Sequence, residues 1–242
     1  MEPLVSERAY IDWLPAGEPA VRDEDERVIV IQGRTGFYLD VRCRRGESGA
    51  GDTLTWATAG WKTFQPVEEG QDPRARFTAI FDSNRLQPGS ASAACHVDTA
   101  APDDPPDEGS FSTLPNGDVL ERGEMRRPET GIVTPYEELW RRLPLTCGDG
   151  SAPARVLMLE SVEPDPNEKT FCGRVGDWEV GIARHGAGVR AQVQRFDGGG
   201  WTTLSQTAGA GLPLPHLDFE VAAQPDEEIT IGGRRWKVIE QS

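Results

Sequence analysis

One glutamate in the middle of the chain has the placement of a group that could do acid–base chemistry. If residues 119–125 form a strand, their side chains alternate, and Glu121 shares a face with Val119 and Met125. Inside a barrel, burial would disfavour the ionised carboxylate and raise its pKa, which suits proton transfer or the binding of a polar ligand group. The alternatives are that Glu121 pairs with an inward arginine or that a bulge turns it outward.

Asp82 is the second candidate carboxylate. It follows the apolar strand pattern of Phe77 to Phe81 and precedes Ser83 and Arg85. This position allows two roles, an acid–base group at a strand end or the cap of a turn, for which aspartate is a favoured residue. We name no other catalytic candidate.

Five aromatic residues could line an apolar pocket. Three fall in one expected strand region and two in another, and together they could meet at the mouth of a barrel, where small apolar ligands bind. Plain core packing is the alternative, because aromatic side chains at such spacing also fill hydrophobic interiors. The five residues are Trp56, Trp61, Phe64, Tyr136 and Trp140.

Standard catalytic and metal-binding motifs do not occur in the chain. The sequence lacks G-x-S-x-G, G-x-x-x-x-G-K-[ST], H-E-x-x-H and a helix-opening G-x-G-x-x-G. Only His96 and Asp98 place two potential ligands on one strand face, and an ordinary surface strand explains them as well. The four cysteines are far apart, with no C-x-x-C pair, and are predicted to be reduced thiols. We therefore expect no metal and no cofactor.

The composition behind these candidates predicts an all-β protein. Among 242 residues, 27 are Gly and 19 are Pro, and short runs rich in Val, Ile, Thr and aromatic residues recur between turn residues. Residues 111–125 are typical of a hairpin, with Asn116 and Gly117 in its turn. Thr134 to Trp140 fits either a short capped helix or a strand.

The chain is expected to have three parts. Residues 1–27 are predicted to be a loose N-terminal arm, because the stretch before Val28 is polar and charged. Residues 28–146 and 154–242 are predicted to be two barrel-like domains, separated by the linker-like stretch Pro144 to Pro153. The similar segments GRTGFY at 33–38 and GRVGDW at 173–178 indicate a duplicated domain, and two unrelated β halves are the alternative.

The charge of the chain argues against nucleic acid and anionic membranes as partners. Asp and Glu total 40 against 25 Lys and Arg, so the formal net charge is −15 and such surfaces would be repelled. The chain starts without a cationic and apolar leader, and no run reaches membrane-spanning length. We therefore expect an intracellular protein.

A series of spaced motifs runs through the first part of the chain: Tyr38 to Arg42, Trp56 to Gly60, Phe81 to Ser83, Gly117 to Gly123 and Tyr136 to Arg141. This series resembles the fungal Hri family, named for a yeast protein that associates with a casein kinase I. The resemblance runs from about Val28 to Leu143, and residues 232–240 look like the family's closing strand. It implies two lipocalin-like β-barrels, a location in cytoplasm and nucleus, and no established enzymatic activity, cofactor or catalytic motif.

Three functions follow from the residues and the resemblance. The first is a non-enzymatic interaction protein with a casein kinase I as partner, and the second is a lipocalin-like carrier of a small apolar ligand. The third is a metabolite isomerase or hydrolase that uses Glu121 or Asp82. A core filled with side chains would favour the first, whereas a cavity of several hundred cubic ångströms with an inward carboxylate would favour the others.

The kinase hypothesis names two phosphorylation candidates. Residues 87–110 contain few large apolar side chains and an acidic run, and are expected to form a mobile surface loop. A casein kinase I favours an acidic or phosphorylated residue three positions before its acceptor. Asp107 stands at that offset from Ser110, and Ser110 from Thr113.

Overall fold

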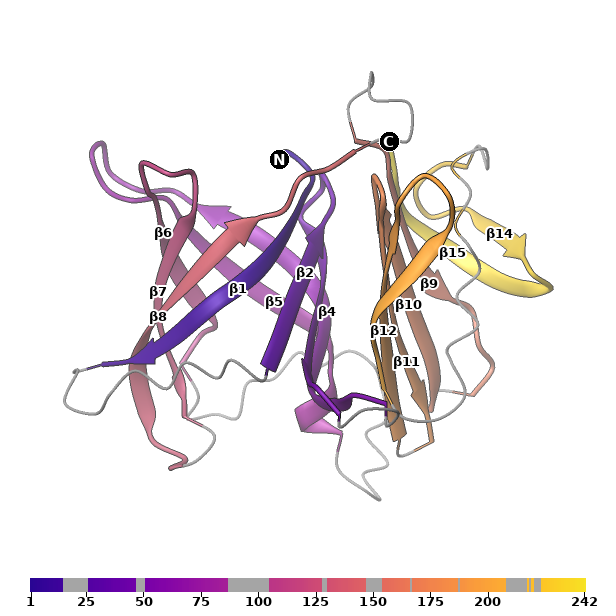
Figure 1. The fold of residues 1–242 in the computed structure, drawn as a ribbon, viewed down its shortest axis with the longest axis horizontal. Helices are drawn as coiled ribbons and strands as arrows, with labels where there is room; N and C mark the ends of the chain where they lie inside the picture. The colour runs from indigo at the N-terminus through magenta and orange to yellow at the C-terminus, as the bar shows by residue number, and fades with distance from the viewer. Residues whose placement is uncertain are drawn as a thin grey trace.

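The computed structural model describes most of the chain, in two antiparallel sheets that lie side by side (Figure 1). Fifteen strands and one short 3-10 helix are assigned, which confirms the all-β class. The described residues are 1–14, 26–46, 51–86, 105–127, 130–146, 154–165, 167–186, 188–207, 217, 219 and 223–242.

The first sheet is a closed barrel of eight strands. Each strand pairs with the next in the chain, and the last closes on the first, so the barrel has no free edge. Its members are β1 (Leu4–Trp13), β2 (Glu26–Gln32), β3 (Phe37–Arg44), β4 (Thr53–Gln65), β5 (Arg74–Asp82), β6 (Glu108–Thr113), β7 (Val119–Arg126) and β8 (Val133–Arg142), with the helix η1 (Ser83–Arg85) after β5.

The prediction of an N-terminal arm is wrong, because β1 is the strand that closes the barrel. It pairs with β2 on one side and with β8 on the other. The inward side of β1 carries Ser6 and Arg8 among the apolar Leu4, Ile11 and Trp13, and the register shifts between Arg8 and Tyr10. The mixed inner face and this shift hide the alternation by which the strand could have been found. The predicted polar stretch before residue 26 lies outside the described residues.

Two local predictions concern the strands β6 to β8. The predicted hairpin is confirmed: β6 and β7 are joined by a turn in which Gly117 has φ +88°, a value that favours glycine. Of the two alternatives for Thr134 to Trp140, the strand is correct. This segment pairs with both β7 and β1, and that pairing outweighs the capping signal.

The second sheet has seven strands in the order β13-β12-β11-β10-β9-β15-β14. Its strands are β9 (Val156–Ser161), β10 (Glu168–Val175), β11 (Trp178–His185), β12 (Gly188–Phe196), β13 (Trp201–Gln206), β14 (Glu228–Ile231) and β15 (Arg234–Gln241). The two sheets divide between Arg142 and Val156, where the predicted linker lies; residues 147–153 are outside the described part.

The second sheet repeats the strand order of the barrel. The run β15-β9-β10-β11-β12-β13 corresponds to β8-β1-β2-β3-β4-β5, and β14 beside β15 corresponds to β7 beside β8. In the described part of the second half, no strand takes the place of β6, and the sheet is open where the barrel is closed. The shared order supports the predicted duplication.

One hydrophobic core joins the two sheets. The outer faces of β2, β3 and β4 contact β10, β11 and β12. Phe171 of β10 lies against Phe37 and Phe81 of the barrel, with ring centroids 6.3 and 5.9 Å away. A Cβ on Gly173 would lie 2.7 Å from Ile31 Cδ1, so a larger residue would have to displace the side chains packed there. The two halves of the chain are therefore also joined by one common hydrophobic core.

A buried glutamate fastens the turn between β2 and β3 to the second sheet. Glu240 of β15, 3% exposed, accepts hydrogen bonds from the backbone N–H groups of Arg34 (2.6 Å) and Thr35 (3.0 Å) and from the Thr35 hydroxyl. A Cβ on Gly33 would lie 2.2 Å from Glu240 Oε2, which explains the first glycine of the GRTG segment.

The variant Glu240→Ala is expected to lower the free energy of unfolding by about 2–4 kcal/mol, because two backbone N–H groups lose a charged acceptor in a buried place. Urea unfolding at pH 7 measures this. Glu228→Ala is the matched control, since Glu228 is exposed and pairs only with the exposed Arg235; it should cost less than about 1 kcal/mol. Equal losses in the two variants would contradict the role of Glu240.

Candidate functional site

The barrel interior holds a cavity of about 1600 Å³, lined by side chains from all eight strands. Small barrels commonly fill this space with packed side chains, and drug-sized ligands need a few hundred cubic ångströms. The barrel therefore has room for a ligand.

Four of the five predicted aromatic residues line the cavity, namely Trp56, Phe64, Tyr136 and Trp140. The prediction for Trp61 is wrong. This side chain lies outside the barrel in the shared core, with its ring centroid 5.1 Å from that of Phe37. The reason is strand alternation, since from Trp56 to Phe64 the side chains of β4 that line the cavity stand at even-numbered positions.

Other cavity-lining aromatic residues were missed, although alternation could have found them. Tyr38 of β3, Phe77 of β5 and Phe111 of β6 all line the cavity. Tyr38 and Phe77 meet edge to face at 5.6 Å, and Phe77 and Phe111 at 6.2 Å. They form a continuous aromatic wall of the cavity.

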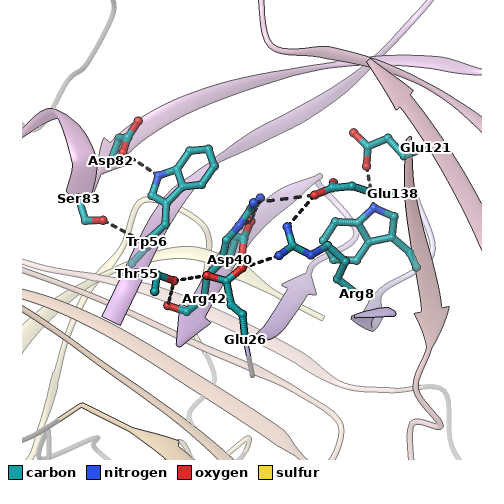
Figure 2. A network of polar contacts seen from close by, with 12 residues as sticks. Arg8, Glu26, Asp40, Arg42, Thr55, Trp56, Asp82, Ser83, Glu121 and Glu138 are labelled. Carbon is teal, nitrogen blue, oxygen red and sulfur yellow. Dashed lines mark hydrogen bonds and ion pairs between the residues drawn. The ribbon is translucent and has the colours of Figure 1, made fainter. Parts of the chain in front are cut away.

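A buried network of charged side chains occupies the polar part of the cavity (Figure 2). Arg8 donates hydrogen bonds to Glu138 (2.8 Å) and to Glu26, and its side chain is 6% exposed. Arg42 donates to Asp40 Oδ2 at 2.9 and 3.1 Å. Sequence reasoning missed this network, because charged residues alternating along a strand normally mark a solvent face.

Arg42 also stacks on an aromatic ring. Its guanidinium lies 4.3 Å from the ring centroid of Trp56, whose indole N–H donates to Asp82 at 2.8 Å (Figure 2). Arg42 therefore belongs to the barrel interior, where its charge is matched by carboxylates, and does not contribute to a basic surface for phosphate backbones.

Glu121 faces the barrel interior, as alternation predicts, and is 5% exposed. The Trp140 indole N–H donates to Oε2 at 2.9 Å and the Tyr136 hydroxyl to Oε1 at 3.3 Å. Burial raises the pKa of Glu121 to about 8; the charge of Glu138 adds to the rise, and that of Lys62 opposes it. Glu121 is thus not turned outward by a bulge, and its partners in the described part are not arginines, the two alternatives considered for it. Its use in acid–base catalysis stays a prediction.

Asp82, the other candidate, is held in a turn. Besides the indole of Trp56, it accepts a hydrogen bond from the backbone N–H of Asn84 at 2.9 Å and caps the helix η1. Arg85 forms an ion pair with it at 3.2 Å. The contacts are those of a turn cap, the alternative considered for this residue.

The family model described as Protein HRI1 matches residues 4–240. The chain belongs to the HRI1 family. No curated protein matches it in sequence.

A solved structure is similar over the whole length. The crystal structure of the uncharacterized protein YLR301w from Saccharomyces cerevisiae is 16% identical, covers 100% of both chains and superposes with a TM-score of 0.71. At this identity the likeness shows the fold alone. The membership in the HRI1 family confirms the resemblance read from the sequence, and the molecular function stays unknown.

The predicted surface loop ends earlier than expected, because residues 105–107 are irregular but β6 begins at Glu108. Ser110 belongs to β6 and is paired on both sides, with Arg74 of β5 and Arg122 of β7. Thr113 is the last residue of β6. A kinase binds its acceptor in an extended, unpaired segment, so Ser110 is a poor acceptor in the folded protein. Residues 87–104 lie outside the described part.

One acidic residue of that segment has partners within the barrel. Glu108 pairs with Arg74 and Arg76, at 3.0 Å in the first pair. Asp107 borders the cavity, where desolvation raises its pKa to about 6, partly offset by the charge of Arg42. The charge of Glu108 is therefore already paired and is not part of a free docking surface.

Metal and thiol chemistry find little support among the described residues. No cluster of three or more His, Cys, Asp or Glu side chains suited to a metal occurs there. His96 and Asp98 lie outside the described part, as do Cys95 and Cys147. Cys43 and Cys172 are buried and free, and burial raises the pKa of Cys43 to about 11. The described part also contains no helix long and apolar enough to cross a membrane.

Glu121 should make stability depend on pH. Because its pKa rises from 4.5 to about 8 on folding, the folded state keeps a proton that the unfolded state loses in this range. The free energy of unfolding should therefore fall as pH rises from about 4.5 to 8. Replacing Glu121 with Gln removes this penalty, and the difference between variant and wild type should shift by about 1–3 kcal/mol in favour of the variant.

Urea unfolding of wild type and Glu121→Gln at pH 5, 6.5 and 8 tests this expectation. Asp107 also has a raised pKa, but it is present in both proteins and cancels in the difference. The control Glu69→Gln changes an exposed carboxylate and should leave the slope unaltered. Parallel pH curves for wild type and Glu121→Gln would contradict the assignment.

Proposed function

We propose that this chain binds a small, largely apolar molecule inside its barrel. The cavity of about 1600 Å³ is the observation that carries the proposal. Unfilled volume in an interior forfeits packing contacts, so a barrel that served only as a scaffold for surface loops would gain by filling it. An aromatic wall with a few polar groups is the usual lining of a ligand site.

The polar groups of the cavity suit orientation of a ligand. Arg8 and Arg42 are already paired with carboxylates, whereas the hydrogen-bond partners of Glu121 in the described part of the chain are the neutral donors Trp140 and Tyr136. A carboxyl group with a pKa near 8 is protonated at neutral pH and can donate a proton. This favours a second candidate, an isomerase or hydrolase acting on the bound molecule.

A protein partner is a third proposal. A casein kinase I as partner, and a location in cytoplasm and nucleus, follow from the resemblance to the yeast protein. The net charge of −15 supports a basic partner surface in general. The strand position of Ser110 argues against that residue as the point of contact.

The test of ligand binding uses the neutral fluorophore N-phenyl-1-naphthylamine. It should bind the wild-type protein saturably, with one site per chain and enhanced emission. Val30 of β2 lines the cavity, and Val30→Phe should weaken binding at least tenfold by filling it. The control Val67→Phe, at an exposed loop position, should bind as wild type does. Absence of saturable binding by the wild type would overturn the proposal.

A further inference from the structure

Lys62 is the one lysine of the barrel half, and its ammonium group is placed against aromatic rings. Its Nζ lies 3.8 Å from the ring centroid of Phe111, 5.2 Å from that of Phe77 and 5.6 Å from that of Phe64. All four side chains line the cavity. Lys62 thus stands at the aromatic wall, where an apolar ligand would lie.

No ion pair is found for Lys62 among the described residues. The other lysines of the chain both have one, Lys169 with Glu160 and Lys237 with Asp226. Burial lowers the pKa of Lys62, although the charge of Glu121 opposes this, and burial raises that of Glu121. An amine whose pKa is lowered and a carboxyl group whose pKa is raised therefore share one cavity. Desolvation of this kind is how a lysine becomes a nucleophile.

We propose that Lys62 binds an aldehyde or ketone ligand covalently, as an imine formed inside the barrel. The inference rests on the proposed function, because it names the chemistry of the ligand for the same cavity. The apolar body of the ligand would lie along Phe77 and Phe111, and its carbonyl carbon would meet Lys62 Nζ.

The reaction balances with the groups present. The lone pair of the Lys62 amine attacks the carbonyl carbon, the electron pair of the C=O bond passes to oxygen, and a proton moves from nitrogen to that oxygen. The carbinolamine hydroxyl then takes a proton from the carboxyl group of Glu121 and leaves as water, while the nitrogen lone pair forms the C=N bond. The product is a protonated imine with the Glu121 carboxylate as its counter-ion.

The surroundings of Glu121 suit that change of charge. Trp140 and Tyr136 donate hydrogen bonds to its two oxygens and would stabilise the carboxylate as it forms. The charged groups that act on Glu121 are Glu138 from β8, Lys62 from β4 and Asp107 before β6. Imine formation should therefore be fastest where Lys62 is deprotonated and Glu121 still protonated, and slow toward both lower and higher pH.

The experiment uses decanal as the probe, with cyanoborohydride to reduce any imine to a stable N-decyl lysine. Peptide mass spectrometry of the wild-type chain should find the adduct on Lys62 at least tenfold above Lys169 and Lys237, which serve as controls within the same molecule. This measurement needs no variant and is unaffected by folding defects. Equal labelling of the three lysines, or none on Lys62, would overturn the inference.

Variants and matched ligands test the imine at Lys62 further. Lys62→Arg replaces the amine with a guanidinium, which forms no imine, and should abolish the barrel adduct. Glu121→Gln should slow adduct formation about tenfold and remove the decline at high pH. Decanol and decanoate should displace the fluorophore only reversibly. If decanoate displaces it tenfold better than decanal and blocks labelling, Lys62 is a binding site for anions and the inference fails.

The two proposals can fail separately. A protein that does not bind N-phenyl-1-naphthylamine contradicts the proposed ligand cavity itself. A protein that binds the fluorophore, loses it with Val30→Phe, and yet shows no decanal adduct on Lys62 keeps the proposed function and loses the imine chemistry.

Discussion

Phe171→Ala is expected to lower the free energy of unfolding by about 3–5 kcal/mol and to loosen both sheets at once. Phe171 is 1% exposed and packs against Phe37 and Phe81 from the other half of the chain. Removing the ring leaves a cavity in the core that the two sheets share, and neither sheet can close it alone because each is held by its own strand pairing.

Two measurements distinguish this from a local defect. Urea unfolding gives the size of the loss, and Phe196→Ala, a half-buried phenylalanine of β12 that packs on Trp201, is the matched control and should lose less than half as much. Hydrogen exchange of peptides from β3 and β10 should show that protection falls in both sheets together. Lost protection in β10 alone would mean that the halves are energetically separate.

The shared core has the form of an interface between two copies of one unit. Strands with the same place in the two sheet orders face each other: β2 contacts β10, β3 contacts β11 and β4 contacts β12. Self-complementary faces of this kind are typical of symmetric dimers. A duplication that joined two such subunits in one chain explains why β2, β3 and β4 are apolar on their outer side, where a single barrel would be polar.

Strand alternation predicted part of the site and part of the fold. It failed for strands that face the cavity on one side and the shared core on the other. It placed Glu121 inward, and the hairpin turn at Gly117 is where the Asn-Gly pair predicts it. It could not find β1, whose inner face holds Arg8, nor decide the side of Trp61. In this barrel the outer face of some strands is the core and the inner face is partly charged, the reverse of the usual pattern.

Removing Arg8 should be the most costly change within the barrel. Its side chain is 6% exposed and pairs with Glu138 and Glu26, which are themselves largely buried. Arg8→Met keeps the apolar stem but leaves two carboxylates without their common cation, and is expected to lower the free energy of unfolding by about 3–5 kcal/mol. Arg122→Met is the matched control, because Arg122 is half exposed and pairs with Glu137 on the outside of the barrel; it should cost less than about 1 kcal/mol.

The loss in Arg8→Met should come from charge left unpaired, and a double variant would show it. Adding Glu138→Gln to Arg8→Met should recover part of the stability, because the second change removes one of the unpaired charges. A deficit that Glu138→Gln leaves unrelieved would instead assign the role of Arg8 to packing of its stem, and the charged network would then be a lining for ligands with little part in holding the barrel closed.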